Sequence, residues 1–151
     1  MSVGIGYDSH RFAEGRRLVL GGVEIEHDLG LEGHSDADVL THAVIDALLG
    51  AAGAGDIGAL FPDDEDRWRD ADSIDLLRTV VGTVAGKIVN IDATLICEQP
   101  RLGPYKADME RVIGEATSAR VTVKATTNEG MGWIGRGEGI ACIAVAFVQS
   151  Q

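Results

Sequence analysis

The sequence predicts a single domain that combines β-strands with α-helices. The chain has 151 residues, which is long enough to bury a core of its own. Its apolar residues alternate along some segments, as in strands, and recur every three to four positions along others, as in helices. The predicted strands are residues 3–12, 18–20, 23–25, 88–97, 121–125 and 140–148, and the predicted helices are residues 36–49, 73–85 and 104–117.

The charge balance narrows the range of partners. The chain carries 24 Asp and Glu residues against 13 Lys and Arg residues, a formal net charge of −11. Without a basic patch to neutralise phosphates, it is not expected to bind nucleic acid. A phosphate ester would also be repelled, so a site for one would need bound cations or backbone N–H groups.

The sequence predicts a cytoplasmic protein. No apolar signal segment opens the chain, and the longest apolar run, residues 140–148, is too short to cross a bilayer. Cys97 and Cys142 lie in strand-like segments and form no CxxC motif. We therefore expect both thiols to be reduced and buried, and we expect no membrane partner.

The first strand and the hairpin follow from simple patterns. Even-numbered side chains of residues 3–12 share one face, so Asp8 and His10 point the same way, as two ligands of one metal ion would. Taken alone, D-x-H occurs in many proteins by chance. Two short segments of mainly apolar residues, 18–20 and 23–25, are separated by two glycines, which indicates a tight hairpin.

The helix at 36–49 follows Ser35, a favourable N-cap residue, and ends in glycines. Asp38, His42 and Asp46 are four residues apart and share one face. A histidine flanked by acids can have its ring oriented by a carboxylate, as a metal-binding histidine needs. A solvated polar face would show the same pattern, and the helix alone leaves both interpretations open.

Residues 55–66 are rich in Gly and acids, which predicts a loop. The loop is either a solvated linker or, because glycines bracket Asp56, a place where the backbone approaches a ligand. Asp72 and Ser73 then cap the helix at 73–85.

The C-terminal half closes the sheet. Alternation in 88–97 puts one set of residues on a common face, namely Val89, Ile91, Ala93, Leu95 and Cys97. Pro104 begins the third helix after a turn at 100–105. The Gly-rich segment 126–139 is either a connector or a binding segment for a phosphate and a metal. Residues 140–148 are nearly all apolar and predict a central strand.

Five separated motifs carry a resemblance to a known family. They are Gly6–Phe12, His34–Asp63, Asn90–Thr94, Pro100–Tyr105 and Lys124–Ala141. In order and spacing they resemble the 2-C-methyl-D-erythritol 2,4-cyclodiphosphate synthase family of the non-mevalonate isoprenoid pathway. The resemblance implies an α+β fold in which residues 1–151 form one domain, with a mixed four-stranded sheet and helices on one face. It also implies a homotrimer that packs the other sheet face at its centre, with active sites between subunits.

The resemblance implies two metal sites. One zinc ion per subunit would be held by Asp8, His10 and His42, with a fourth position open. Asp38 and Asp46 would support this zinc site from the helix. Glu129 would bind Mg²⁺ or Mn²⁺ at the substrate phosphates. Two cations would allow an acidic protein to bind an anionic substrate.

The implied reaction converts 4-diphosphocytidyl-2-C-methyl-D-erythritol 2-phosphate to 2-C-methyl-D-erythritol 2,4-cyclodiphosphate and CMP. The 2-phosphate attacks the β-phosphorus of the same molecule, so no protein nucleophile is required. Catalysis would rest on positioning and on stabilisation of the transferring phosphoryl group. An enzyme of this kind is a phosphorus–oxygen lyase.

The resemblance also assigns residues to roles. The catalytic residues would be His34, Ser35, Thr127 and Glu129. The substrate-binding residues would be Asp56, Gly58, Asp63, Pro100, Arg101, Leu102, Gly103, Thr126, Trp133 and Arg136. In this scheme, residues 100–103 of a neighbouring subunit cradle cytosine, and Trp133 and Arg136 line a central channel that can hold isoprenoid diphosphates.

Four positions depart from the family's usual residues. Arg101 replaces a lysine, Asp64 a threonine, Gly130 a lysine and Trp133 a phenylalanine. The change at Arg101 keeps the charge but not the shape of the side chain. None of the four is an expected metal ligand.

Two other classes of function remain open on the residues alone. A zinc-dependent phosphohydrolase would use the same Asp8, His10 and His42 with a metal-bound water as nucleophile. A trimeric, zinc-stabilised binding module that senses isoprenoid diphosphates through Arg136 would show no turnover. Product identity separates the three functions.

Overall fold

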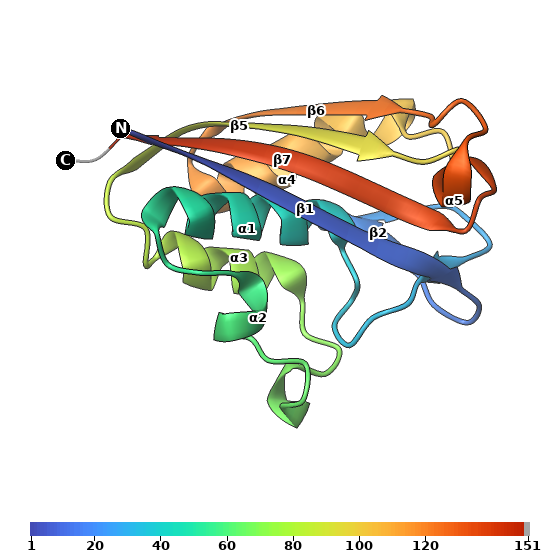
Figure 1. Ribbon diagram of the computed structural model, residues 1–151, viewed down its shortest axis with the longest axis horizontal. Coiled ribbons are helices and arrows are strands. Elements are labelled where there is room, and N and C mark those ends of the chain that lie inside the picture. The colour runs from blue at the N-terminus through green and yellow to red at the C-terminus, as the bar shows by residue number, and fades with distance from the viewer. Residues whose placement is uncertain (150–151) are drawn as a thin grey trace.

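The computed structural model describes residues 1–149, so positions 150–151 of the predicted domain lie outside the described part. A twisted sheet carries helices packed against it (Figure 1). The strands are β1 (Ser2–Ala13), β2 (Leu18–Leu20), β3 (Val23–Ile25), β4 (Gly30–Leu31), β5 (Lys87–Ile96), β6 (Arg120–Thr126) and β7 (Gly139–Gln149). The helices are α1 (Val39–Ala52), α2 (Ile57–Leu60), α3 (Ser73–Val81), α4 (Lys106–Thr117) and α5 (Gly132–Gly135), with 3₁₀ turns at Asp66–Trp68 and Gly103–Tyr105.

The main sheet of the described residues has the order β4-β1-β7-β5-β6, and β2 pairs with β3 separately. It is mixed, because β7 is antiparallel to β1 and β5 whereas β6 is parallel to β5. The α+β class and the central position of the last strand are confirmed. The predicted count of four strands is wrong, because Phe12 and Ala13 run beyond β7 and pair with the two residues of β4. A strand this short carries no alternation that a sequence could reveal.

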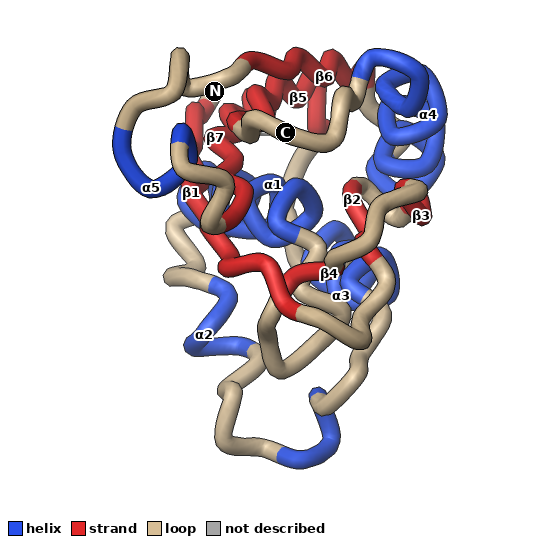
Figure 2. Tube along the Cα trace, turned by 90° about the vertical axis from the view of Figure 1, so that its right-hand side faces the viewer, coloured by secondary structure: helices blue, strands red, loops and turns tan. Residues whose placement is uncertain are grey.

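Helices α1 and α4 pack against the sheet, and α3 packs on both of them from outside (Figure 2). Helix α1 contacts β1 and β7 on one side and α3 on the other. Ten of its 14 residues are buried, because it lies between two layers. Such a helix is apolar on nearly all sides rather than along one stripe.

Close contact between β1 and α1 depends on glycine. At Gly4 and Gly6, an added Cβ would stand 1.9 Å from a carbonyl oxygen of α1. The even-numbered face of β1 is therefore the face on which α1 lies. Asp8 and His10 continue this face, as predicted, and so point toward the first turn of α1, which carries His42.

The start of α1 differs from the prediction. The N-cap residue is Asp38, whose side chain accepts a hydrogen bond from the backbone N–H of Thr41. Ser35 does not cap the helix, because Ala37 has a φ of 55° and interrupts helical geometry before Val39. The end of α1 also differs: the helix continues through Gly50 to Ala52, so the predicted end at residue 49 is three residues too early. Of the two predicted terminating glycines only Gly53 ends the helix, and it has the left-handed conformation.

Three smaller differences have local causes. A register shift between Ile88 and Asn90 buries Ile88 instead of Val89. Helices α2 and α5 are single turns inside segments predicted to be loops. Helix α3 ends four residues earlier than the predicted end at 85.

Cys97 and Cys142 are buried and form no disulfide, as predicted. In the described part of the chain, no helix is long and apolar enough to cross a bilayer.

Candidate active site

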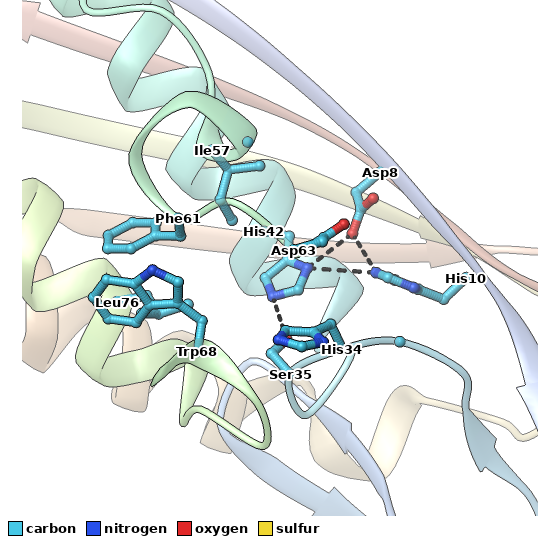
Figure 3. Close-up of a pocket in the computed structure, with 12 residues that line it drawn as sticks. Asp8, His10, His34, Ser35, His42, Ile57, Phe61, Asp63, Trp68 and Leu76 are labelled. Carbon is cyan, nitrogen blue, oxygen red and sulfur yellow. Dashed lines mark hydrogen bonds and ion pairs between the residues drawn. The ribbon is translucent and has the colours of Figure 1, made fainter. Parts of the chain in front are cut away.

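Three side chains from two elements meet beside the sheet (Figure 3). Asp8 and His10 come from β1 and His42 comes from α1. Asp8 Oδ2 lies 2.9 Å from His10 Nε2 and 3.2 Å from His42 Nδ1. The two ring nitrogens are 3.4 Å apart. The three donor atoms thus form one compact cluster, which we call the metal cluster.

The metal cluster has the chemistry and size of a zinc site. One carboxylate and two imidazoles match the donor types of catalytic zinc, and donors about 2.0–2.1 Å from a tetrahedral ion stand about 3.3 Å apart. His10 Nδ1 lies 2.8 Å from the carbonyl oxygen of Glu32, which can only accept. Nδ1 therefore carries the hydrogen, and Nε2 of the neutral ring presents a lone pair to the cluster. Electron-rich atoms that converge in this way require a proton or a cation between them.

The electrostatics of the cluster favour positive charge. Burial opposes ionisation of Asp8, but hydrogen bonds and charges from His10 and His42 outweigh it and lower the pKa of Asp8. Burial likewise opposes a charged His42, yet the hydrogen bond and charge of Asp8, with the charges of Asp38 and Asp36, raise the pKa of His42. The pocket therefore attracts a cation.

Asp38 and Asp46, the acids predicted to support His42, have other partners. Asp38 accepts hydrogen bonds from two backbone N–H groups of the β2–β3 turn, each at 2.8 Å, and from Thr41 N and Oγ1. Asp46 accepts from the N–H of Ile57 at 2.8 Å. In the described part of the chain neither carboxylate hydrogen-bonds the His42 ring, and both act on it only through charge.

Two serines contact the outer nitrogen of His42 instead. His42 Nε2 lies 2.8 Å from Ser73 Oγ and 3.2 Å from Ser35 Oγ. Ser73 is the first residue of α3 and is fully buried. Its sequence context predicts only a helix start, so its place beside His42 follows from tertiary packing and has no local signal.

A cavity of about 350 Å³ opens beside the metal cluster. It brings together four further predicted residues, namely His34, Ser35, Gly58 and Asp63. Apart from Gly33, its remaining wall consists of four large apolar residues that were not predicted: Ile57, Phe61, Trp68 and Leu76. The rings of Phe61 and Trp68 meet edge to face, with centroids 4.9 Å apart. The available signal for Ile57, Phe61 and Trp68 was their large apolar side chains among the acids of residues 56–70, whereas Leu76 lies in α3.

The residues predicted to contact cytosine and the phosphates lie in a second pocket, about 500 Å³ in volume, whereas Asp56 and Gly58, which the resemblance places at the ribose, do not line it. It lies where β5 and β6 end, and its predicted members are Pro100, Arg101, Leu102, Gly103, Thr126 and Thr127. The two pockets share no lining residue. Within one chain, the predicted residues beside the metal cluster and those of the second pocket therefore form two separate groups.

Glu129 is exposed on a loop whose backbone is tied down around it. Its φ is 52°, and its N–H donates to Thr127 Oγ1 at 3.2 Å. Glu98 Oε1 accepts hydrogen bonds from the N–H groups of Asn128 at 2.8 Å and Gly130 at 3.3 Å. Glu98 was not predicted, and it fixes the loop on both sides of the Glu129 carboxylate.

Three of the predicted substrate-binding residues line neither pocket. Asp56 caps α2 through its side chain. Trp133 lines a smaller hollow of about 210 Å³ together with His10 and Glu138. Arg136 forms an ion pair with Glu138 at 2.8 Å.

Known proteins are similar to this chain along its length. A protein of Symbiobacterium thermophilum named 2-C-methyl-D-erythritol 2,4-cyclodiphosphate synthase is 55% identical, with 98% of each chain covered. A protein of the same name from Salinibacter ruber is also 55% identical, with 99% of each covered. A solved 2C-methyl-D-erythritol-2,4-cyclodiphosphate synthase in its CDP-bound form is 35% identical with a TM-score of 0.87, covering 97% of this chain and 99% of that one. A model of the YgbB family matches residues 1–149, and the chain belongs to this family.

Proposed function

We propose that this chain converts 4-diphosphocytidyl-2-C-methyl-D-erythritol 2-phosphate to 2-C-methyl-D-erythritol 2,4-cyclodiphosphate and CMP, in isoprenoid precursor biosynthesis. The observation that carries the proposal is the metal cluster of Asp8, His10 and His42 at a cavity. Relatives that match nearly the full chain are named for synthesis of the same cyclic product.

The proposed reaction joins two ends of one molecule. An oxygen of the 2-phosphate attacks the β-phosphorus, the bond from that phosphorus to the bridging oxygen breaks, and CMP leaves with the bridging oxygen. This makes the protein a phosphorus–oxygen lyase. Because nucleophile and electrophile belong to one substrate, the protein must mainly hold them in line. Alignment of this kind supplies about 7–11 kcal/mol in favourable cases.

The cavity residues suit this task. His34 and Ser35 stand beside the metal cluster, where they would bind the 2-phosphate, and Asp63 would accept a hydrogen bond from a substrate hydroxyl. Phe61 and Trp68 form an apolar wall that would contact the carbon skeleton and exclude water. In the second pocket, the backbone of residues 100–103 would hold cytosine, with Thr126 and Thr127 near the phosphates.

The proposed reaction uses two metal ions, each held by side chains of this chain. Asp8, His10 and His42 would hold zinc, and Glu129 would hold Mg²⁺ or Mn²⁺. When bound, the two cations would stabilise charge on the phosphate oxygens by several kcal/mol. A protein with a net charge of −11 needs such cations to bind a substrate of the same sign.

We also propose a homotrimer with active sites between subunits. Five apolar side chains of β1 and β7 are 38–70% exposed on the sheet face opposite α1: Val3, Ile5, Tyr7, Ile143 and Val145. Ile5 pairs with Val145 and Tyr7 with Ile143, so these side chains form a continuous surface, which we call the apolar face. Exposed patches of this kind mark interfaces. Packing around this face would let the nucleotide pocket of one subunit complete the metal-cluster pocket of the next.

Phosphorus NMR of the purified protein with this substrate, Zn²⁺ and Mg²⁺ tests the function. We expect CMP and a cyclic diphosphate. CMP with a linear phosphate would replace the cyclase by a hydrolase and leave the metal site standing. No turnover in the presence of both metals would reject an enzymatic function and favour a binding module.

A further inference from the structure

The outer nitrogen of His42 begins a chain of hydrogen bonds that runs through the buried Ser73 and ends on the half-buried carboxylate of Asp36. His42 Nε2 lies 2.8 Å from Ser73 Oγ, and Ser73 Oγ also makes a short hydrogen bond with Asp36 Oδ1. Asp36 Oδ2 accepts a hydrogen bond from the backbone N–H of Ser73 at 2.9 Å. Asp36 therefore holds Ser73 by both its N–H and its O–H.

One arrangement of hydrogens satisfies this chain. An ionised carboxylate can only accept, so the Ser73 hydroxyl donates to Asp36. The serine oxygen then offers only lone pairs to His42, so Nε2 of His42 carries the hydrogen and donates. In the neutral ring Nδ1 is left with a lone pair. Nδ1 is the atom that faces Asp8 Oδ2 at 3.2 Å and His10 Nε2 at 3.4 Å.

The members of the chain are held in place by the fold. Ser73 is fully buried and His42 is 9% exposed. The N–H of Asp36 donates to the carbonyl oxygen of Ala71 at 3.3 Å, just before α3. The next residue, Ala37, has a φ of 55°, which is unfavourable for a side chain other than glycine. The turn that brings Asp36 to α3 thus keeps a strained residue.

We propose that Asp36 and Ser73 are positioning residues of the metal site, which act through His42. By fixing the orientation of the His42 ring and the nitrogen that carries its hydrogen, they present Nδ1 to the cation before it binds. The inference rests on the proposed zinc site and extends it by two residues on other elements. Removing such outer partners typically weakens metal binding by about 10–100-fold.

Two substitutions break the chain at different points. Ser73→Ala removes the hydroxyl, and the remaining partner of Nε2 is Ser35 Oγ at 3.2 Å. Asp36→Asn keeps the size of the side chain but replaces one acceptor by an NH₂ donor, which must face either the Ser73 oxygen or its N–H. Zinc affinity is measured on the purified, metal-stripped chain by competition with a chromophoric chelator. Co²⁺ absorption reports the geometry of the site.

Ser73→Ala and Asp36→Asn are each expected to weaken Zn²⁺ binding by about 10–100-fold and to shift the Co²⁺ bands. Asp72→Ala is the matched control, because Asp72 caps α3 through a 2.8 Å bond from Ile74 N, one residue from Ser73, without contacting His42. It should lower the melting temperature and leave zinc affinity and the Co²⁺ spectrum unchanged. His42→Ala, which removes a metal ligand, shows the zinc affinity and the Co²⁺ spectrum expected when the metal site is lost.

The outcomes separate the inference from the proposed site on which it rests. Unchanged Zn²⁺ affinity in Ser73→Ala and Asp36→Asn overturns the positioning role while the zinc site stands. An equal loss of affinity in Asp72→Ala also overturns it, because the effect would then come from the stability of α3. An unsubstituted protein that binds no zinc overturns the metal site and the positioning role together.

Discussion

At the scale of single residues, Asp38 joins the β2–β3 turn to the start of α1. Its two oxygens accept hydrogen bonds from the backbone N–H groups of Gly21 and Gly22, which form the β2–β3 turn at positive φ. They also accept from the N–H and hydroxyl of Thr41 in the first turn of α1. The side chain is fully buried, so water cannot replace it at any of these donors.

Asp38→Ala is expected to lower the free energy of unfolding by about 2–4 kcal/mol, because a helix cap is lost and buried donors lose their acceptor. Asp72→Ala removes a single capping bond from the start of α3 and should cost about 1 kcal/mol. Urea unfolding of both variants measures the difference. An equal decrease in the free energy of unfolding in both variants would show that Asp38 contributes no more than an ordinary helix cap.

A second prediction for a single residue concerns Glu129, the proposed ligand of Mg²⁺ or Mn²⁺. Glu129→Gln keeps the size of the side chain and removes its charge. We expect unchanged zinc binding and a rate at saturating Mg²⁺ that is lower by about 10²–10³-fold, since charge stabilisation at the phosphates is lost. Glu115→Gln, an exposed substitution on α4, should leave the Mg²⁺ dependence intact. A Mg²⁺ titration of Glu129→Gln that matches the original protein would remove this role.

At the scale of elements, the contact between β1 and α1 builds the metal cluster. Gly6 faces α1 so closely that an alanine Cβ would stand 1.9 Å from the Ala43 carbonyl oxygen. Gly50 lies in α1 itself, and a Cβ there would be 3.6 Å from its nearest neighbour. The β1–α1 interface therefore has no room for a side chain at Gly6 but has room for one at Gly50.

Gly6→Ala is expected to lower the free energy of unfolding by about 3 kcal/mol or more, because backbone cannot move aside as a side chain can. It should also weaken zinc binding, since β1 carries Asp8 and His10 while α1 carries His42. Gly50→Ala should raise stability by about 0.5–1 kcal/mol, because alanine favours a helix interior. Thermal unfolding tests both substitutions, and a stable Gly6→Ala variant with full zinc affinity would contradict the close contact between β1 and α1.

Sequence periodicity predicts elements well and their junctions poorly. Alternation in β1 correctly puts Asp8 and His10 on one face, and the all-apolar β7 is central. The start of α1 was misplaced because the positive φ of Ala37 depends on the turn that carries Asp36 to α3. Ser73 could not be found from the sequence, since its neighbour His42 is 31 positions away and nothing in its own segment indicates that contact.

At the scale of the whole molecule, the apolar face and the two separate pockets support the same assembly. Ile5 of β1 is 70% exposed, beside Val145 of β7. A second and a third copy would cover this surface. They would also place the nucleotide pocket of one chain against the metal-cluster pocket of another.

If the proposed trimer forms, Ile5→Asp is expected to convert it to monomers, because three charges would be buried against one another. Light scattering should report the mass of one chain instead of three. The monomer should keep zinc affinity, since all three ligands come from one chain, and should lose turnover. Ala85→Asp adds the same charge at an exposed position after α3 and should leave the mass unchanged. An active Ile5→Asp monomer would contradict active sites shared between subunits.

The most direct test of cyclisation is phosphorus NMR of the reaction run in water enriched with ¹⁸O. An oxygen of the substrate's own 2-phosphate is the proposed nucleophile, so neither CMP nor the cyclic diphosphate should gain an ¹⁸O atom or show an isotope shift. An ¹⁸O label in CMP or in a linear phosphate product would show attack by water at the metal cluster and would contradict the proposed cyclisation.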